Sequence, residues 1–340
     1  MASSALVLGL AACRSVPGDA AVAIVPDDAR GTTTVVVDGV PAVTWCHGAD
    51  LAFPHWLLSG PSGRPLLDPA PEPYPHHRAL WIADKVQLGD GPVVDFYHCT
   101  KNVRDDGDVS RYRHAIRHRR FTELAVRDGV ALLAAEACWE VDGQPVLDDE
   151  RRLTVTPLGA GEVLLDLRWT LRASHGPVHF HSDAVHYAWP YLRLRPEWSV
   201  ARGGTMVDDQ GREGQQATHG QEARWIDCSA TVDGATEGVA VFLPPDQAPR
   251  RWLTRDYGCF GPRRAAALDG TRFTLARGAA LEGRVVIFVH RGDHESGRVA
   301  ERYRDFVRGE GVTRAVPSAR GGVPAGRRAA HVADGGEEER

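Results

Sequence analysis

The chain has 340 residues, of which 43% are hydrophobic and 25% are charged, and its formal net charge is −5 at pH 7. These values are close to those of an average globular protein. A chain with this charge offers no broad basic surface to a phosphate backbone, which argues against nucleic acid as a partner. No apolar run approaches the roughly 18 residues that a membrane-spanning helix needs, so we expect no transmembrane segment.

The first residues of the chain resemble the end of a bacterial lipoprotein signal. An apolar stretch from Ala5 to Ala12 leads into Leu-Ala-Ala-Cys, in which Cys13 is the residue that takes the lipid. No Lys or Arg precedes this stretch and the apolar region is short, features that favour an ordinary N-terminus. We expect an extracytoplasmic lipoprotein with a signal or linker over residues 1–20, and the alternative is a cytoplasmic protein.

Residues 163–172 alternate between apolar and polar side chains. Leu165, Leu167, Trp169 and Leu171 share one face, and Asp, Arg and Thr side chains share the other. This period of two is typical of a strand with one buried and one solvated side. Similar patterns predict further strands at residues 33–37, 41–45, 121–126, 131–141, 151–155, 238–242, 271–275 and 284–290.

Turn signals separate these segments. Asp-Gly pairs occupy residues 38–39, 128–129, 142–143, 233–234 and 269–270, and Gly-Ala-Gly occupies 159–161. Asp-Gly between alternating segments is a strong signal for a β-hairpin. Many strands with such turns and little helix predict an all-β fold, a large β-sandwich.

One helix is expected near the C-terminal end of the fold. Val299, Tyr303, Phe306 and Val307 form an apolar stripe at helical spacing, and Asp293 can cap the helix at its N-terminus.

Two other regions depart from the strand pattern. Residues 202–220 are rich in Gly, Gln and Asp and are predicted to form a long loop, the kind of segment that often contacts ligands. Residues 313–340 contain few apolar side chains and are predicted to form a disordered tail. This leaves residues 21–312 as a single β-sandwich domain.

The densest group of ionisable and aromatic side chains lies between Tyr74 and Trp81. His76, His77 and Arg78 place two imidazoles and a fixed cation beside the Trp81 indole. Such parts are common in sugar sites, because rings stack on the apolar faces of pyranoses and ionisable groups move protons. The alternative is structural, with the ring in the core and the histidines capping loops.

The nearby segment 94–98 adds a carboxylate and further rings. If it is a strand, Asp95, Tyr97 and Cys99 share one face, while Phe96 and His98 share the other.

A second histidine cluster lies at residues 179–186. On a strand, His179, His181 and Asp183 share one face, which is acceptable geometry for a 2-His-1-carboxylate metal site. The HxH spacing is superficially similar to that of cupins, but no Glu follows at the spacing that those sites use. We therefore expect no required metal or other cofactor, and treat these histidines as solvated or hydrogen-bonded.

Two further segments, Arg224–Asp227 and Arg255–Gly258, combine an arginine, an aspartate and a ring. Most such neighbours are local structural pairs, but they can also orient ligand hydroxyls or a carboxylate. The chain has no Gly-rich phosphate loop, no GxSxG and no HExxH, which argues against nucleotide-dependent enzymes, α/β-hydrolases and zincin proteases. Its six cysteines show no metal-ligand spacing.

Taken in order, these segments resemble the PmoA-like domain family of bacteria. The family's "PHHRGLWF…NGVDFW" is matched at residues 74–81 and 93–97, its "RWVDYSG" at 224–230, its "W-x-x-RDYG-x-F" at 252–260 and its "HRGD" at 290–293. The resemblance spans roughly residues 33–308. This sequence departs from the pattern at three places: Ala79 stands for Gly, Tyr97 for Trp, and Gly-Pro-Arg-Arg at 261–264 for Asn-Pro-Phe.

The resemblance implies a fold and a substrate class. The family's label, methane oxygenase, belongs to a membrane-embedded copper enzyme with spanning helices, and this sequence has none, so we reject methane oxidation. Family members look like distant relatives of the galactose-mutarotase-like supersandwich and often occur among bacterial polysaccharide-use genes. A carbohydrate is therefore the expected substrate, although fold analogy alone is a weak warrant for function.

The preferred hypothesis is a carbohydrate-active enzyme, a hydrolase, lyase or epimerase acting on a sugar or oligosaccharide. We expect His77 or His76 as acid or base, with Asp95 or Asp256 as its partner. The candidate catalytic residues are His76, His77, Asp95 and Asp256, and the candidate substrate-binding residues are Arg78, Trp81, Tyr97, His98, His186, Arg255 and Tyr257. The alternatives are a non-catalytic sugar-binding protein and a metal-dependent oxygenase. The sugar and the oligomeric state stay open.

The lipoprotein hypothesis is tested by fractionation. With its native upstream sequence, the protein should separate with membranes, and Cys13→Ala should release it because the lipid then has no attachment site. An unchanged soluble pool in both forms would refute the hypothesis.

Overall fold

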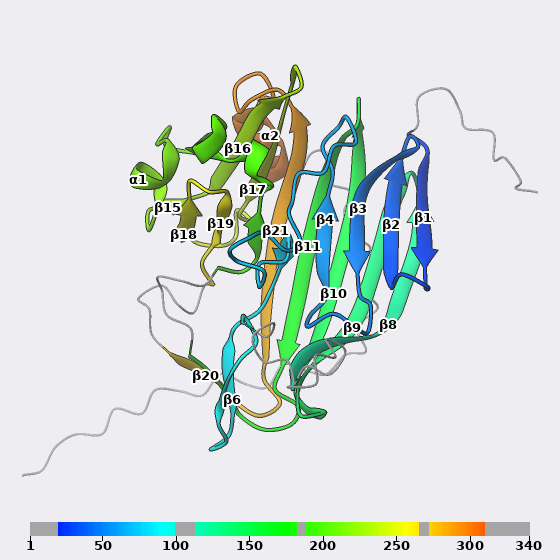
Figure 1. The fold of residues 1–340 in the computed structure, drawn as a ribbon, viewed down its shortest axis with the longest axis vertical. Coiled ribbons are helices and arrows are strands. Elements are labelled where there is room, and N and C mark those ends of the chain that lie inside the picture. Colours follow the sequence, from blue (N-terminus) through cyan, green and yellow to red (C-terminus); the bar gives the residue numbers. More distant parts are fainter. Residues whose placement is uncertain (1–19, 99–112, 182–187, 265–271, 310–340) are drawn as a thin grey trace, which may run out of the picture.

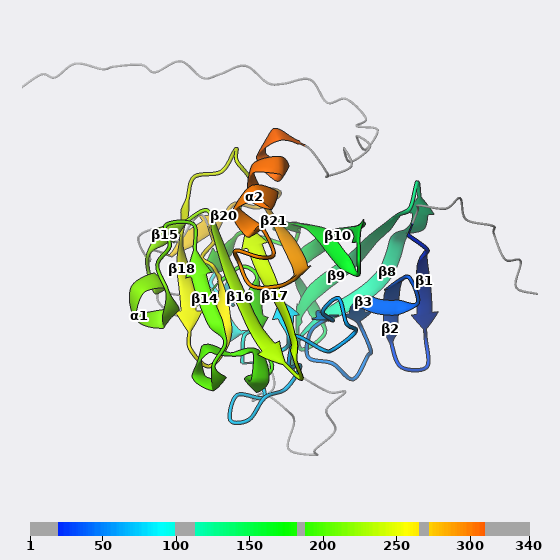
Figure 2. The same cartoon turned by 90° about the horizontal axis from the view of Figure 1, so that it is seen from above.

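The computed structural model describes residues 20–98, 113–181, 188–264 and 272–309, and antiparallel strands dominate it (Figure 1). Twenty-one strands in these ranges form sheets of nine, eight and four strands. Figures 1 and 2 show two layers, in which strands β1–β3 lie over β8–β10. The structure confirms the predicted all-β sandwich with a C-terminal helix.

The nine-stranded sheet supplies one layer and, at one end, the site described below. Its strands, in spatial order, are β1 (Val22–Asp27), β2 (Thr32–Val37), β3 (Val40–Cys46), β4 (His55–Leu58), β5 (Leu80–Trp81), β13 (Tyr191–Arg193), β19 (Cys259–Pro262), β18 (Arg250–Arg255) and β15 (Glu222–Ala223).

The eight-stranded sheet forms the other layer. Its strands, in spatial order, are β14 (Thr205–Asp208), β16 (Trp225–Val232), β17 (Ala235–Phe242), β21 (Ala280–Arg291), β11 (Glu162–Arg172), β10 (Gln144–Gly159), β9 (Val130–Val141) and β8 (His114–Arg127). The small third sheet contains β20 (Phe273–Leu275), β12 (Val178–Phe180), β6 (Lys85–Leu88) and β7 (Val93–Asp95).

Strand β11 shows how the apolar pattern builds the core. Leu165, Leu167 and Leu171 are fully buried, and they belong to the main hydrophobic cluster between the sheets. On the other face, Asp166 accepts hydrogen bonds from Arg168 and Arg284. Burial alone would raise the pKa of Asp166, but these two guanidinium groups hold it below its ordinary value. The predicted alternation is confirmed for the core face, but the other face is only partly solvated, because Leu164 and Asp166 on it are buried.

The described Asp-Gly pairs close hairpins as predicted. Asp38, Asp128, Asp142 and Asp233 have φ values of 51°, 50°, 48° and 48°, and the glycine after each also has a positive φ. Two successive residues with positive φ match the type I′ turn, whose twist fits the twist of the paired strands. The pair at residues 269–270 lies outside the described residues.

The C-terminal helix α2 (Val299–Arg308) packs on the outer face of the eight-stranded sheet. Val299 and Phe306 join Phe242 and Phe288 in a second hydrophobic cluster there. The predicted cap is wrong, because the residue before the helix is Arg298. Asp293 instead accepts hydrogen bonds from the backbone and hydroxyl of Ser296 in the preceding turn.

The predicted long loop at residues 202–220 is also only partly correct. It contains strand β14 and the one-turn helix α1 (Gly214–Thr218), and it follows two short 3₁₀ turns, Pro196–Trp198 and Val200–Arg202. The expected boundaries at residues 1–20 and 313–340 fall at or beyond the ends of the described ranges and stay predictions. None of the helices in those ranges is long and apolar enough to span a membrane.

A buried ion pair joins the third sheet to the nine-stranded sheet. Asp84, before β6, accepts a hydrogen bond of 2.8 Å from Arg264, after β19, and both side chains are almost inaccessible to solvent. The Arg264 guanidinium also lies 4.8 Å from the centre of the Phe273 ring in β20. Arg264 is also one of the residues, at 261–264, at which this chain departs from the PmoA-like pattern.

Removing one partner of this pair should destabilise the fold strongly. Asp84→Ala is expected to lower the free energy of unfolding by about 3–5 kcal/mol, because the buried guanidinium then lacks its counter-charge. The matched control is Glu136→Ala, which breaks the exposed pair with Arg120 and should cost about 1 kcal/mol or less. Equal losses in urea unfolding of the two variants would contradict this account.

Candidate functional site

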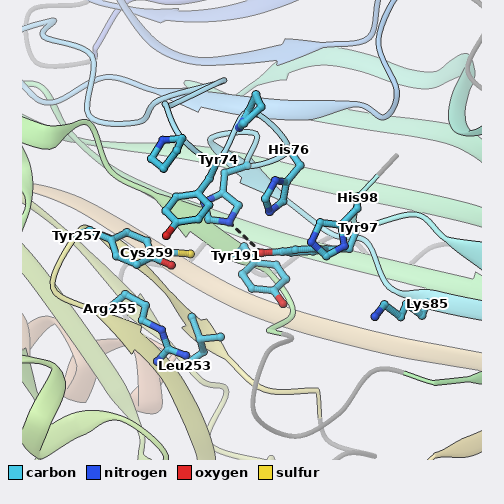
Figure 3. A pocket seen from close by; sticks show the side chains of 13 residues that line it. Tyr74, His76, Lys85, Tyr97, His98, Tyr191, Leu253, Arg255, Tyr257 and Cys259 are labelled. Atoms are coloured by element: carbon cyan, nitrogen blue, oxygen red, sulfur yellow. Dashed lines mark hydrogen bonds between the residues drawn. The ribbon is translucent and has the colours of Figure 1, made fainter. Parts of the chain in front are cut away.

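A pocket of about 620 Å³ lies at the β5–β13–β19–β18 end of the nine-stranded sheet (Figure 3). Loop residues from the segments 73–77 and 97–98 form one side of it, and strand residues form the other. Its lining residues are Pro73, Tyr74, Pro75, His76, His77, Lys85, Tyr97, His98, Tyr191, Leu253, Arg255, Tyr257 and Cys259. The structure therefore brings together the His-His, Tyr-His and Arg-Asp-Tyr segments that the sequence singled out.

Strand register places the sheet residues of this pocket on one face. Tyr191 pairs with Trp81, and Cys259 pairs with both Arg193 and Arg255 across neighbouring strands. Paired residues in adjacent strands point to the same side of a sheet, so these side chains share the pocket side. Their chain neighbours Leu192, Thr254 and Phe260 point to the opposite side and are buried.

A stack of rings supports the pocket from the sheet. His77 lies between Tyr74 and Trp81, with ring centres 5.2 and 5.4 Å away, and Trp81 stacks on Tyr191 at 4.7 Å. Trp81 itself is fully buried and does not line the pocket. It therefore fixes the positions of the rings above it and does not meet a ligand, which corrects its expected place among the lining residues.

Tyr74 and Tyr257 form the exposed part of this ring system. Their rings stack with centres 5.5 Å apart, and Tyr74 is 38% exposed. Burial raises the pKa of Tyr257 to about 12 and that of the neighbouring Cys259 to about 12. Both groups therefore stay protonated at neutral pH, so Cys259 is no thiolate nucleophile.

Asp95 pairs with His98, and this differs from the predicted pairing with His76 or His77. The carboxylate of Asp95 lies 2.8 Å from His98 Nδ1, and it also accepts a hydrogen bond of 3.0 Å from the His98 backbone N–H. Lys85 Nζ lies 3.6 Å from the same carboxylate. Burial alone would raise the pKa of Asp95, but the bonds from His98 and the charge of Lys85 hold it below its ordinary value.

His77 is held in a neutral state by its surroundings. Its Nε2 lies 3.0 Å from the Tyr97 hydroxyl. Burial, and then the neighbouring His76, Arg193 and His98, lower the pKa of His77 to about 2. An imidazole with a lowered pKa is a weak base, which argues against the proton transfer predicted for His77, whereas its Nε2 contact orients the Tyr97 hydroxyl.

Several predicted site residues lie outside the pocket. Arg78 donates a hydrogen bond to the Pro69 carbonyl, and Asp256 accepts one of 2.8 Å from the Gln215 backbone. Neither side chain lines the pocket. His186 falls outside the described residues, so its predicted role stays a prediction.

The predicted metal cluster is only partly within the described ranges. His179 is hydrogen bonded to Thr274 at 2.7 Å, and His181 to Gln87 at 2.9 Å. Asp183 lies outside those ranges. A different group with metal-ligand spacing contains Cys138 in β9, Asp148 in β10 and His175 in the bend after β11, and none of them lines the pocket. Burial raises the pKa of the Cys138 thiol, which disfavours the thiolate that a metal needs.

Two of the sequence motifs, at residues 224–230 and 290–293, meet each other in the core. His290 and Asp227 are fully buried, with His290 Nε2 2.7 Å from the Asp227 carboxylate. Burial alone would lower the pKa of His290, but Asp227 raises it above its ordinary value. These two segments therefore join β16 to β21 and do not contribute to the pocket.

Sequence reasoning did not select seven of the lining residues: Pro73, Tyr74, Pro75, Lys85, Tyr191, Leu253 and Cys259. Tyr74 lies next to the His-His pair, and Lys85 is one of only two lysines in the chain, so both could have been found. Tyr191 and Leu253 enter the pocket only through strand pairing, which leaves no local signal in the sequence.

The neutral state of His77 predicts acid sensitivity. The folded protein binds no proton at His77 between pH 6.5 and about 2, whereas the unfolded chain does. The free energy of unfolding should therefore fall with decreasing pH, approaching about 1.4 kcal/mol per pH unit for this group. Urea unfolding of His77→Gln below pH 6.5 should show a shallower pH dependence than the wild type, and parallel curves would contradict the assignment.

Comparison with known proteins identifies a family. No curated protein matches this chain. One solved structure that matches is a GalM/aldose epimerase homologue from C. elegans, with 10% sequence identity and a TM-score of 0.31, over 81% of this chain and 99% of that one. At this score, the match carries no argument about ligand or reaction. A family described as one of unknown function, DUF6807, matches residues 32–304. The chain therefore belongs to the DUF6807 family.

Proposed function

We propose that this protein is a carbohydrate-active enzyme in which His98, oriented by Asp95, transfers protons to and from a sugar bound in the pocket. The observation that supports this most is the 2.8 Å contact between the Asp95 carboxylate and His98 Nδ1 at the edge of a pocket lined by rings. The comparisons support the DUF6807 family and not the PmoA-like label, and DUF6807 is of unknown function, so the carbohydrate assignment rests on the pocket.

The geometry of the pair fits acid–base chemistry. A carboxylate that accepts a hydrogen bond from one imidazole nitrogen fixes the orientation and tautomer of the ring, and it stabilises the protonated form. Because Nδ1 of His98 faces Asp95, Nε2 is the nitrogen left for a ligand. His98, expected only to bind substrate, thus takes the role first given to His77, and Asp95 is a positioning residue.

The walls of the pocket fit a small sugar. Its volume of about 620 Å³ lies within the range of small-molecule sites. The stacked rings of Tyr74 and Tyr257 present an aromatic face, and such faces pack on the apolar side of a pyranose. Tyr97, held by His77, supplies a hydroxyl at the same wall.

The pocket favours some reactions over others. Glycoside hydrolysis commonly uses two carboxylates on opposite sides of the scissile bond. Within the described part of the chain, no Asp or Glu lines the pocket, and Asp95, which contacts two lining residues, is held by them, His98 and Lys85. A lyase or epimerase, which needs a base and an acid but no carboxylate nucleophile, therefore fits better than a hydrolase.

A non-catalytic sugar-binding protein is the second candidate. The pKa of His77 is lowered to about 2, and its ring is stacked between those of Tyr74 and Trp81. Both features favour a role in which His77 only shapes the binding surface. The two candidates differ in what His98 does, because only catalysis requires a proton to move through it.

His98→Gln tests the proposal. Pyranoses, glycosides and their oxidised derivatives are incubated with the wild type and followed by NMR. For a sugar that the wild type converts, His98→Gln should lower the rate by about 10²–10⁴-fold, which is the usual contribution of a general acid or base. Its melting temperature should stay close to that of the wild type.

The matched control is His179→Gln, because His179 lies outside the pocket on β12. This variant should keep full activity. Full activity in His98→Gln would overturn the assignment of the base. Binding of a sugar without any conversion by the wild type would favour the sugar-binding candidate.

A further inference from the structure

The charged side chains that line the pocket are all basic. Lys85 and Arg255 line it, on opposite sides of Tyr191 (Figure 3), together with three histidines. Asp and Glu are absent from the lining within the described ranges. A site with this lining has a positive electrostatic potential, and it raises the local concentration of anions.

Arg255 differs from the arginines and lysines that form ion pairs in the described ranges, because its hydrogen bonds are with a histidine and a backbone carbonyl. One of its guanidinium nitrogens lies 3.0 Å from His219 Nδ1 and donates to the Thr254 carbonyl at 2.9 Å, and neither partner is a carboxylate. No carboxylate of the described residues forms a salt bridge with it. Its neighbour Asp256 turns away and is satisfied by the Gln215 backbone.

A second guanidinium lies beneath the pocket. Arg193 is 4% exposed, and its carbon Cζ lies 4.5 Å from the centre of the Tyr257 ring. It donates a hydrogen bond to the Tyr257 carbonyl. Again, no salt bridge joins it to a carboxylate in the ranges that the structure covers. By contrast, the buried Arg151 is paired with Asp149 at 2.7 Å.

Lys85 differs from these two arginines because Asp95 already balances part of its charge. The distance of 3.6 Å between Lys85 Nζ and the Asp95 carboxylate belongs to a half-exposed pair. A ligand anion is therefore expected at the Arg255 end of the pocket, while the Asp95–His98 pair acts at the Lys85 end.

From these contacts we infer that the sugar carries a carboxylate, as in a uronic acid, and that Arg255 binds this group. The inference rests on the proposed function, since it names the substrate class of the same pocket. Arginine presents parallel N–H groups that match the two oxygens of a carboxylate. The Tyr74 and Tyr257 rings then lie against the sugar, next to the bound anion.

A carboxylate fits this pocket better than a phosphate group. Phosphate sites usually add several backbone N–H groups from a Gly-rich loop or a helix N-terminus. Neither feature lines the pocket within the described segments. Arg255 has the one guanidinium among the described residues that line the pocket, because Arg193 is buried beneath Tyr257, and this one guanidinium matches the single negative charge of a uronate.

Calorimetry at low salt with matched sugars tests the inference. Glucuronate and galacturonate should bind about 10–100-fold more tightly than glucose and galactose, the range expected for a charge-assisted hydrogen-bond pair. Arg255→Gln should remove this preference, so that uronates bind this variant no more tightly than the neutral sugars do. Arg251→Gln, with the same charge change on an exposed residue of β18 outside the pocket, should keep the preference.

Including His98→Gln in the same titrations separates the two proposals. This variant should lose turnover and still prefer uronates, because the anion lies at the Arg255 end. Equal binding of neutral sugars and uronates to the wild type would overturn the inference and leave the acid–base proposal standing. Tighter binding of glucose 6-phosphate than of glucuronate would overturn the carboxylate assignment. If no sugar binds, both proposals fail.

Discussion

Side chains alternate between the two faces of a strand, and the pocket depends on this constraint at the β5–β13–β19–β18 end of the sheet. Register pairs Tyr191 with Trp81 and Cys259 with Arg255, so one face of four short strands collects the rings and the guanidinium group. The residues between them fill the core. A shift of one residue in any of these strands would exchange the two sets, so the stability of the sandwich and the composition of the pocket are fixed together.

Burial then decides the chemistry of each ionisable group. Arg264 and Arg151 lie in the protein interior, and each is balanced by a carboxylate at hydrogen-bond distance. Among the described residues, no carboxylate forms a hydrogen bond or ion pair with His77, and burial lowers its pKa. Asp95 is held ionised by His98 and Lys85. The same desolvation thus produces a neutral hydrogen-bonding histidine and an oriented Asp–His pair within one pocket, because the two histidines have different neighbours.

Local patterns predicted most of the fold and part of the site. Alternation identified β11, and Asp-Gly pairs identified four hairpins, because both signals depend on neighbouring residues. The Asp95–His98 pair escaped prediction for a physical reason. Alternation places these residues on opposite faces, but β7 ends at Asp95 and the chain turns, so that the His98 N–H reaches the Asp95 carboxylate. Tyr191 escaped because only pairing with β5 and β19 brings it to the pocket.

The motifs that led to the PmoA-like resemblance serve two separate purposes. The segments around His77 and Arg255 line the pocket, whereas Asp227 and His290 meet in the core and join β16 to β21. Ala79, in the first motif, has a backbone role and does not line the pocket. It has a φ of 57°, a left-handed conformation that favours glycine, the residue of the family pattern. That motif position is therefore set by the backbone turn before β5. A motif match alone cannot tell a residue that meets a ligand from one that positions the backbone, and here burial and strand register make the distinction.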